Sequence, residues 1–193
     1  MLPREKLRLS TPTRQNEVAA IVQEPMRGVI DALATIEMDE VVRCVCTLPE
    51  GNFAAGFDSG TLHIYGSDGV VIDSAALDSR VVGLASLRSV LVAGTSTGGV
   101  QAFHDEPLWD HPLESGCEAV TASSFRVVVA DGTGRLISLT DDGSEVAQAE
   151  FGHITSLTCS PEGVCAAALE DGRLLLLGPG LEVLHDSPAA EDD

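Results

Sequence analysis

The sequence predicts an all-β protein built from four copies of one small antiparallel sheet. Three observations carry this prediction: glycines recur at near-constant spacing, an apolar or alternating run flanks each of them, and the residues beside them suit tight hairpins. The recurring glycines are 39, 35 and 38 residues apart, at Gly60, Gly99, Gly134 and Gly172. A repeated unit, rather than one continuous sheet, is therefore expected.

Each recurring glycine separates two predicted strands of a hairpin. The strands after the glycines are expected at residues 61–65, 100–103, 135–139 and 173–177, and those before them at residues 53–57, 90–94, 127–130 and 164–169. A first strand is expected upstream at residues 41–46, 81–85, 118–122 and 154–158, and a fourth follows a further turn, as at residues 70–73 and 145–147. Four short antiparallel strands in each repeat make one blade of a β-propeller.

The repeats are expected at about residues 38–77, 78–115, 116–151 and 152–187. The tail, residues 188–193, is acidic and is expected to be disordered. The predicted fold is thus a small β-propeller of four full four-stranded blades. An open array would expose strand edges, so we expect the ring to close within one chain or by pairing with a second copy.

Residues 1–37 have two interpretations. The favoured one is a partial blade, because Gly28-Val29-Ile30-Asp31-Ala32 ahead of Val41-Val42 echoes the fourth strand of the first repeat ahead of Val81-Val82. The alternative is an N-terminal helical arm that begins at Thr11-Pro12, because the apolar residues between Val18 and Leu33 fall near helical spacing.

The fourth repeat carries a family resemblance. Gly152-His153-Ile154, Ser160-Pro161-Glu162-Gly163 and Asp171-Gly172-Arg173-Leu174 resemble a WD-type blade, and the resemblance extends more weakly over residues 38–187. The Trp-Asp pair of WD repeats is replaced by Tyr65-Gly66, Phe103-His104, Leu139-Thr140 and Leu177-Gly178. The spacing also resembles quinoprotein-like propellers, in which a tryptophan lies near the fourth strand, as Trp109 does. The resemblance implies a propeller and leaves the subfamily open.

The charge balance excludes two classes of partner. The chain has 30 acidic and 11 basic residues, a formal charge of -19, and Lys6 is its only lysine. Such a surface repels phosphate backbones and anionic headgroups, so we expect neither nucleic acid nor a membrane as partner. The composition resembles that of proteins from halophilic archaea; an acidic protein of a high-GC bacterium is the alternative.

The cysteines and the absence of apolar segments predict a cytoplasmic protein. No run of 18 apolar residues and no secretory signal is visible in the sequence. The five cysteines are odd in number and lack C-x-x-C spacing, at positions 44, 46, 117, 159 and 165. This pattern predicts reduced thiols and argues against a disulfide framework or a zinc site.

Two clusters contain possible metal ligands, and we favour a structural role for both. His104-Asp105-Glu106 and Trp109-Asp110-His111 lie in one connector of the second repeat and could bind a divalent metal, but a solvated hairpin turn explains them. Cys44 and Cys46 share one face of a strand and could bind a soft metal or sense oxidants, but buried packing explains them as well.

The acidic turns and the aromatic residues also have structural explanations. Asp58-Ser59-Gly60, Asp141-Asp142-Gly143 and Glu170-Asp171-Gly172 lack the ligand pattern of a calcium loop, and turn chemistry accounts for them. Aromatic side chains that could anchor a partner, but that core packing explains equally well, are Phe103, Trp109 and Phe151. We therefore predict no catalytic, cofactor-binding or metal-binding residues, and the sequence does not identify the protein-binding ones.

The predicted function is a non-catalytic protein-interaction scaffold of the β-propeller type. It follows from the repeat scaffold and the resemblance, without a motif for nucleophilic, phosphate or zinc chemistry. One alternative is a quinoprotein-like enzyme or ligand binder that uses the axial channel. Another is a structural subunit that completes a larger propeller or assembly. We expect no cofactor and a protein partner, and we leave open whether a second copy of the chain is also a partner.

Overall fold

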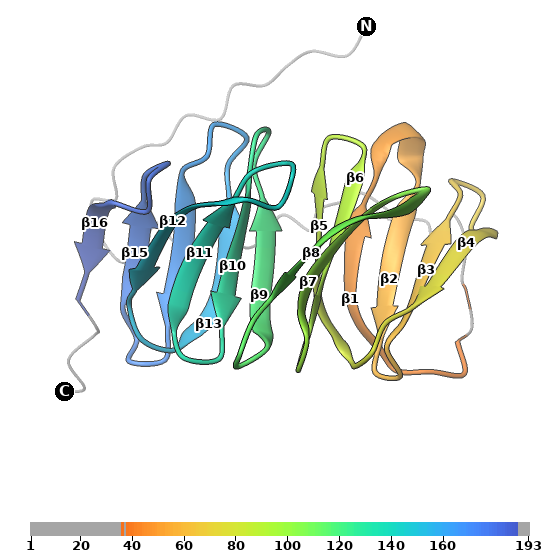
Figure 1. The fold of residues 1–193 in the computed structure, drawn as a ribbon, viewed down its shortest axis with the longest axis horizontal. Coiled ribbons are helices and arrows are strands. Elements are labelled where there is room, and N and C mark those ends of the chain that lie inside the picture. The colour runs from red at the N-terminus through yellow and green to blue at the C-terminus, as the bar shows by residue number, and fades with distance from the viewer. Residues whose placement is uncertain (1–35, 37, 189–193) are drawn as a thin grey trace, which may run out of the picture. The chain divides into compact units, whose positions relative to one another are not determined.

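The computed structural model describes residue 36 and residues 38–188 and confirms the predicted fold class. These residues form sixteen strands and one short 3-10 helix, η1 (Pro49–Gly51). The strands make four antiparallel four-stranded sheets (Figure 1). The predicted partial blade and the alternative helical arm, within residues 1–37, fall almost entirely outside the described residues. In the part of the chain that the structure describes, no helix is long and apolar enough to cross a membrane.

Within each sheet the strands pair in sequence order. The first sheet contains β1 (Val42–Thr47), β2 (Phe53–Phe57), β3 (Thr61–Tyr65) and β4 (Val71–Ala76). The second contains β5 (Val81–Leu87), β6 (Val90–Thr95), β7 (Gly99–His104) and β8 (Glu106–Pro112). The third contains β9 (Cys117–Ala122), β10 (Val127–Asp131), β11 (Arg135–Leu139) and β12 (Glu145–Glu150). The fourth contains β13 (Ile154–Cys159), β14 (Cys165–Leu169), β15 (Leu174–Leu177) and β16 (Val183–Ser187).

The recurring glycines occupy the predicted bends. Gly60, Gly99, Gly134 and Gly172 all have positive φ and lie in or beside the turn between the second and third strands of their sheets. At Gly60 a side chain would also collide, because a Cβ there would lie 2.7 Å from the carbonyl oxygen of Leu77. The repeat seen in the sequence therefore marks one structural position in four equivalent sheets.

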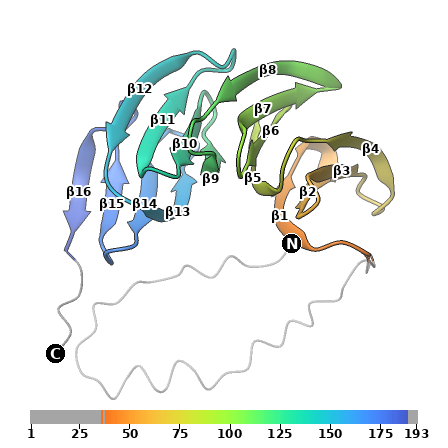
Figure 2. The ribbon, with the colours of Figure 1, turned by 60° about the horizontal axis from the view of Figure 1, so that its bottom comes forward.

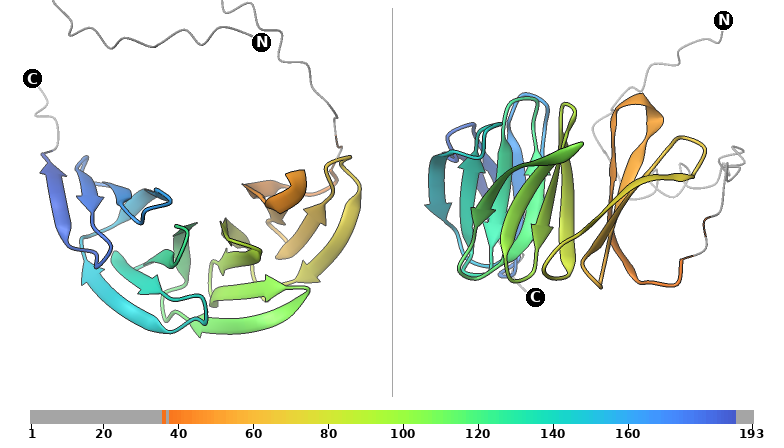
Figure 3. Two further views of the ribbon diagram at one scale, coloured as in Figure 1. Left: turned by 90° about the horizontal axis from the view of Figure 1, so that it is seen from above. Right: turned by 45° about the vertical axis from the view of Figure 1, so that its right-hand side comes forward.

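The sheets follow one another along an arc, with their first strands on its inner side (Figures 2 and 3). The inner strands contact in the order β1, β5, β9 and β13. We call the face that a sheet turns toward the next sheet in sequence its forward face, and the opposite one its rear face. The first and fourth sheets lie at the two ends of the arc (Figure 3).

Apolar side chains fill the space between successive sheets. Between the first and second sheets, Leu62 of a forward face packs with Leu84 and Leu91 of a rear face. The second and third sheets enclose a core that contains Val100 and Ile137. The third and fourth sheets repeat the arrangement; the buried members of their core include Val128, Leu136, Cys165, Leu175 and Leu177. Each internal sheet is thus apolar on both faces.

The prediction of five reduced thiols is wrong for one pair. Cys159 and Cys165 form a disulfide, whereas Cys44, Cys46 and Cys117 are free. The pairing arises because the β13–β14 hairpin places Cys159 and Cys165 directly opposite each other. A separation of six residues carries no disulfide signal until the hairpin register is known.

Candidate binding surface

The turns between the first and second strands of all four sheets surround one hollow on the inner side of the arc. Its volume is about 570 Å³. The lining residues come from every sheet: Thr47, Leu48, Pro49, Ser86, Arg88, Ala122, Ser123, Ser124, Cys159 and Pro161. We call this site the turn hollow. Its lining combines hydroxyl groups and small apolar side chains with a single cation, Arg88.

Local backbone geometry keeps these turns short. In the second sheet Arg88 adopts a φ of 57°, which lets β5 turn directly into β6. In the third sheet the backbone N–H of Ser123 donates to the carbonyl oxygen of Arg126 at 2.9 Å. In the fourth, the N–H of Ser160 donates to the carbonyl oxygen of Val164 at 2.7 Å. The hollow is therefore bordered by hydrogen-bonded turns on a β scaffold.

Arg126, at the end of the turn between β9 and β10, connects this turn to the turn between β13 and β14. Its guanidinium is buried, and Nη2 donates to the carbonyl oxygen of Gly163 at 2.8 Å and to that of Gly178 at 3.4 Å. Burial lowers the pKa of Arg126, and the nearby carboxylate of Glu182 partly offsets this effect. The third sheet is thus tied to two segments of the fourth through backbone carbonyls.

Phe125 projects beside the turn hollow. It is 45% exposed, next to the lining residue Ser124, and its ring centroid lies 5.4 Å from Cζ of Arg126. The ring covers Gly163, where a Cβ would lie 2.6 Å from Cζ of Phe125 and where φ is 87°. Phe125 is therefore a half-exposed aromatic side chain that neighbouring residues hold in position.

A second hollow, of about 480 Å³, lies near the other end of the inner strands. It contains Arg80, Glu118 and His153. Nδ1 of His153 lies 3.2 Å from Oε2 of Glu118, and this contact connects the third and fourth sheets. Nη1 of Arg80 lies 3.9 Å from Oδ1 of Asp58, and this contact connects the first and second sheets. Because both contacts connect neighbouring sheets, the charged side chains around this second hollow are explained by a role in holding the sheets together.

The structure places the predicted metal-ligand cluster of the second repeat differently from the sequence interpretation. His104 ends β7 and Glu106 begins β8, but Trp109-Asp110-His111 lies within β8 and not in a connector. Nε1 of Trp109 donates to the carbonyl oxygen of Asp141 at 2.8 Å, so this side chain packs on a turn of the third sheet. Within residues 36 and 38–188, no group of three or more His, Cys, Asp or Glu side chains could hold a metal ion.

Packing accounts for Cys44 and Cys46. Both lie against the apolar core between the first and second sheets. Burial raises the pKa of Cys44 to about 11, and it also raises the pKa of Cys46. Since the thiolate is the reactive and metal-binding form, both thiols are poorly suited to redox or metal chemistry at neutral pH.

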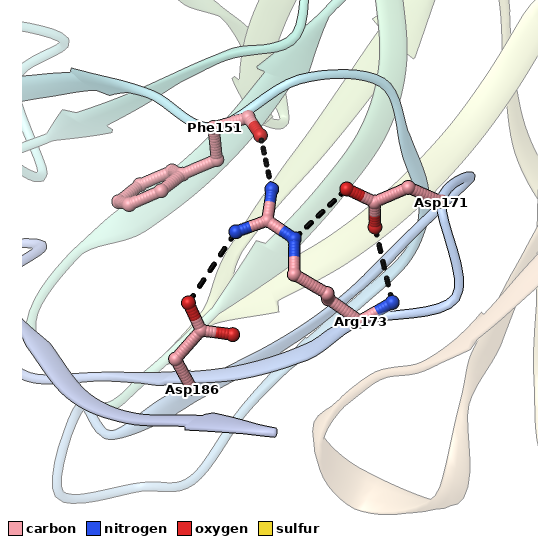
Figure 4. A network of polar contacts seen from close by, with 4 residues as sticks. All are labelled: Phe151, Asp171, Arg173 and Asp186. Atoms are coloured by element: carbon pink, nitrogen blue, oxygen red, sulfur yellow. Dashed lines mark hydrogen bonds and ion pairs between the residues drawn. The ribbon is translucent and has the colours of Figure 1, made fainter. Parts of the chain in front are cut away.

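The carboxylates of the acidic turns accept hydrogen bonds from neighbouring side chains of the same chain. Figure 4 shows Arg173, whose Nε donates to Asp171 at 2.8 Å, while its other nitrogens reach Asp186 at 3.3 Å and the carbonyl oxygen of Phe151 at 3.4 Å. Phe151, which the sequence suggests as a candidate anchor for a partner, takes part in this network only through its backbone carbonyl oxygen. The network ties the fourth sheet to the connector that precedes it.

Sequence reasoning missed the residues of the turn hollow. The lining residues are mostly serine, alanine, leucine and proline, which carry no chemical motif. Arg126 and Phe125 had one available signal: they form an arginine–aromatic pair at a strand start in a chain with only 11 basic residues. Only the stacking of the sheets brings these turns together.

Comparisons with solved structures agree on the fold. The chain is similar to the RRP9 WD40 repeats, with 12% identity and a TM-score of 0.69 over 77% of this chain and 52% of that one. It is also similar to BamB from Moraxella catarrhalis, with 18% identity and a TM-score of 0.66 over 79% and 50% of the two chains.

A third similar structure is the computationally designed Ika4 protein, with 17% identity and a TM-score of 0.69 over 78% of this chain and 99% of that one. The chain thus spans about half the length of the RRP9 and BamB structures. Comparison with protein-family models and with curated proteins finds no match. The described part of the chain therefore has the fold of β-propeller blades.

Proposed function

We propose that the protein is a non-catalytic interaction scaffold whose binding surface is the turn hollow together with Phe125. The observation that carries the proposal is the convergence of turns from all four sheets on one hollow of about 570 Å³. Phe125 is half-exposed and its ring lies against Gly163 of the fourth sheet, so it has the properties of an aromatic residue that anchors a protein interface.

The chemistry of the surface indicates what it could bind. Hydroxyl groups and small apolar side chains line it, and the chain as a whole carries a charge of -19. Such a surface suits a protein partner with an apolar anchor and a neutral or basic surround. The fold similarity to WD40 repeats supports an interaction role by analogy.

Affinity purification of the full chain from its host, in the salt of that host, tests this proposal. We expect a partner that wild type captures and Phe125→Ser loses, while the control variant Val146→Ser still captures it. Val146 is also an exposed apolar residue, but it lies on the outer strand β12. Equal capture by all three proteins, or a catalytic turnover that depends on residues lining the hollow, would overturn the proposal.

A further inference from the structure

The forward face of the fourth sheet has the residues of a covered face but is exposed. Leu174 is equivalent to Leu62, Val100 and Leu136, as the strand registers of the four sheets show. Those three residues are 2%, 1% and 0% exposed because the next sheet covers them, whereas Leu174 is 46% exposed. Leu176, beside it on the same face, is 36% exposed.

The rear face of the first sheet shows the complementary feature on its inner strand. Val45 pairs with Ala55 in the same way as Leu84 pairs with Ala93 and Val120 with Val129. Leu84 and Val120 are 9% and 8% exposed beneath the preceding sheet, whereas Val45 is 68% exposed. The second and third strands of this face differ: Ala55, Phe57 and Tyr65 are only 3%, 2% and 1% exposed, and Met38 packs over Tyr65.

We propose that the fourth sheet of one copy packs on the inner strand of the first sheet of a second copy, so that two chains close a ring of eight sheets. The exposed forward face of the fourth sheet and the exposed inner strand of the first correspond to surfaces that face each other in the three internal interfaces between successive sheets. A head-to-tail contact of this kind forms a closed dimer when the rotation between copies is two-fold. The interface would be repeated twice in the dimer.

The curvature of the arc supports a ring of this size. The four sheets match about half of the RRP9 and BamB chains and nearly all of Ika4. The step from one sheet to the next is therefore similar to that in chains about twice as long as the region of the four sheets. Closure of such a ring would also complete the wall around the turn hollow, although the dimer does not depend on the proposed function.

Size-exclusion chromatography with light scattering on the full chain tests the dimer. The measurement is made in about 1 M potassium chloride, where the Debye length is about 3 Å and repulsion between acidic copies is screened. We expect a mass of two chains for wild type and of one chain for Leu174→Glu and Val45→Glu. Each substitution places a charge in both interfaces, so dimerisation is expected to weaken at least about 100-fold.

Two controls make the arrangement itself testable. Leu108→Glu changes an exposed apolar residue on the outer strand β8 and is expected to leave the dimer intact. Mixing Leu174→Glu with Val45→Glu should restore a dimer, because one of the two interfaces then contains no substitution. Circular dichroism checks that each variant folds, and Leu176→Glu replaces Leu174→Glu if the latter does not.

The remaining outcomes contradict the proposal. A wild-type protein of single-chain mass at every concentration would show that the exposed face is covered from within the chain or stays open. A dimer lost in Leu174→Glu but kept in Val45→Glu would show that two fourth sheets pair with each other. Failure of the mixed variants to associate would likewise exclude a head-to-tail ring.

Discussion

Nη2 of Arg126 in the third sheet donates a hydrogen bond to the carbonyl oxygen of Gly163 in the fourth sheet at 2.8 Å. The guanidinium is almost fully buried, so its desolvation must be offset by the bonds that it makes. Apolar packing alone therefore does not join these two sheets. The buried guanidinium of Arg126, which donates to backbone carbonyl oxygens of the fourth sheet, also contributes to the contact between them.

Replacing Arg126 is expected to loosen this junction. Arg126→Ala removes the bond to Gly163 and the packing of the side-chain stem, which together should cost about 3 kcal/mol of unfolding free energy. Urea unfolding at fixed salt measures the loss. Arg88→Ala is the matched control, because that side chain is exposed and its contact with Asp141 is 3.9 Å long; a change within ~0.5 kcal/mol is expected there. Equal losses in the two variants would contradict a special role for Arg126.

A second buried ion, Asp131, predicts a pH dependence. Burial by itself raises the pKa of Asp131, but bonds from Thr133 and Arg135 outweigh it, so the pKa lies below its ordinary value. The carboxylate accepts from Oγ1 of Thr133 at 2.7 Å and from Nε of Arg135 at 3.0 Å. The stability that these bonds supply is fully present above the unfolded pKa of about 3.9 and is lost as pH falls from there through the lower folded pKa.

Asp131→Asn tests this dependence. We expect a loss of about 2 kcal/mol at pH 7, because bonds to a buried charge are removed. The difference from wild type should shrink as the pH falls below about 4, where wild type loses the same contribution. Unfolding by urea at several pH values measures both effects. Asp171→Asn changes an exposed aspartate of the fourth sheet that binds Arg173, the equivalent of Arg135, and should have a smaller effect. A constant difference from pH 7 to pH 3 would contradict the assignment.

The scaffold could be predicted from the sequence because its signal is local. Gly60 and Gly172 need positive φ, and a hairpin turn is decided within a few residues. The binding surface could not, because Leu48, Ser124 and Pro161 are brought together only by the stacking of separate sheets. The disulfide was missed for a related reason: its cross-strand register depends on the length of one turn.

The disulfide predicts a specific count of thiols. In denaturant without reductant, a thiol reagent should titrate three cysteines per chain, and five after reduction, since only Cys159 and Cys165 are paired. Reduction should lower the unfolding free energy by about 2 kcal/mol, the loop-closure value for so short a loop. Cys165→Ser is expected to show four thiols with or without reductant, which identifies the pair. Five thiols in protein isolated without reductant would exclude the bond.

The charge imbalance predicts that salt stabilises the fold. Because acidic residues outnumber basic ones by 30 to 11, their mutual repulsion opposes folding until it is screened. Between roughly 0.1 and 2 M potassium chloride the screening length falls from about 10 Å to a few ångströms. The melting temperature should therefore rise by at least about 5 °C, equivalent to roughly 2 kcal/mol for a domain of this size.

The salt prediction must be separated from dimerisation, which screening would also favour. Val45→Glu is designed to remain a single chain, so a rise of similar size in this variant would assign the effect to repulsion within one chain. The exposed ion pairs act in the opposite direction, because salt weakens the contact between Arg43 and Asp58, but such pairs contribute little. A melting temperature that is flat across the salt range in both proteins would contradict the prediction, and the halophilic origin suggested by the composition would lose its physical support.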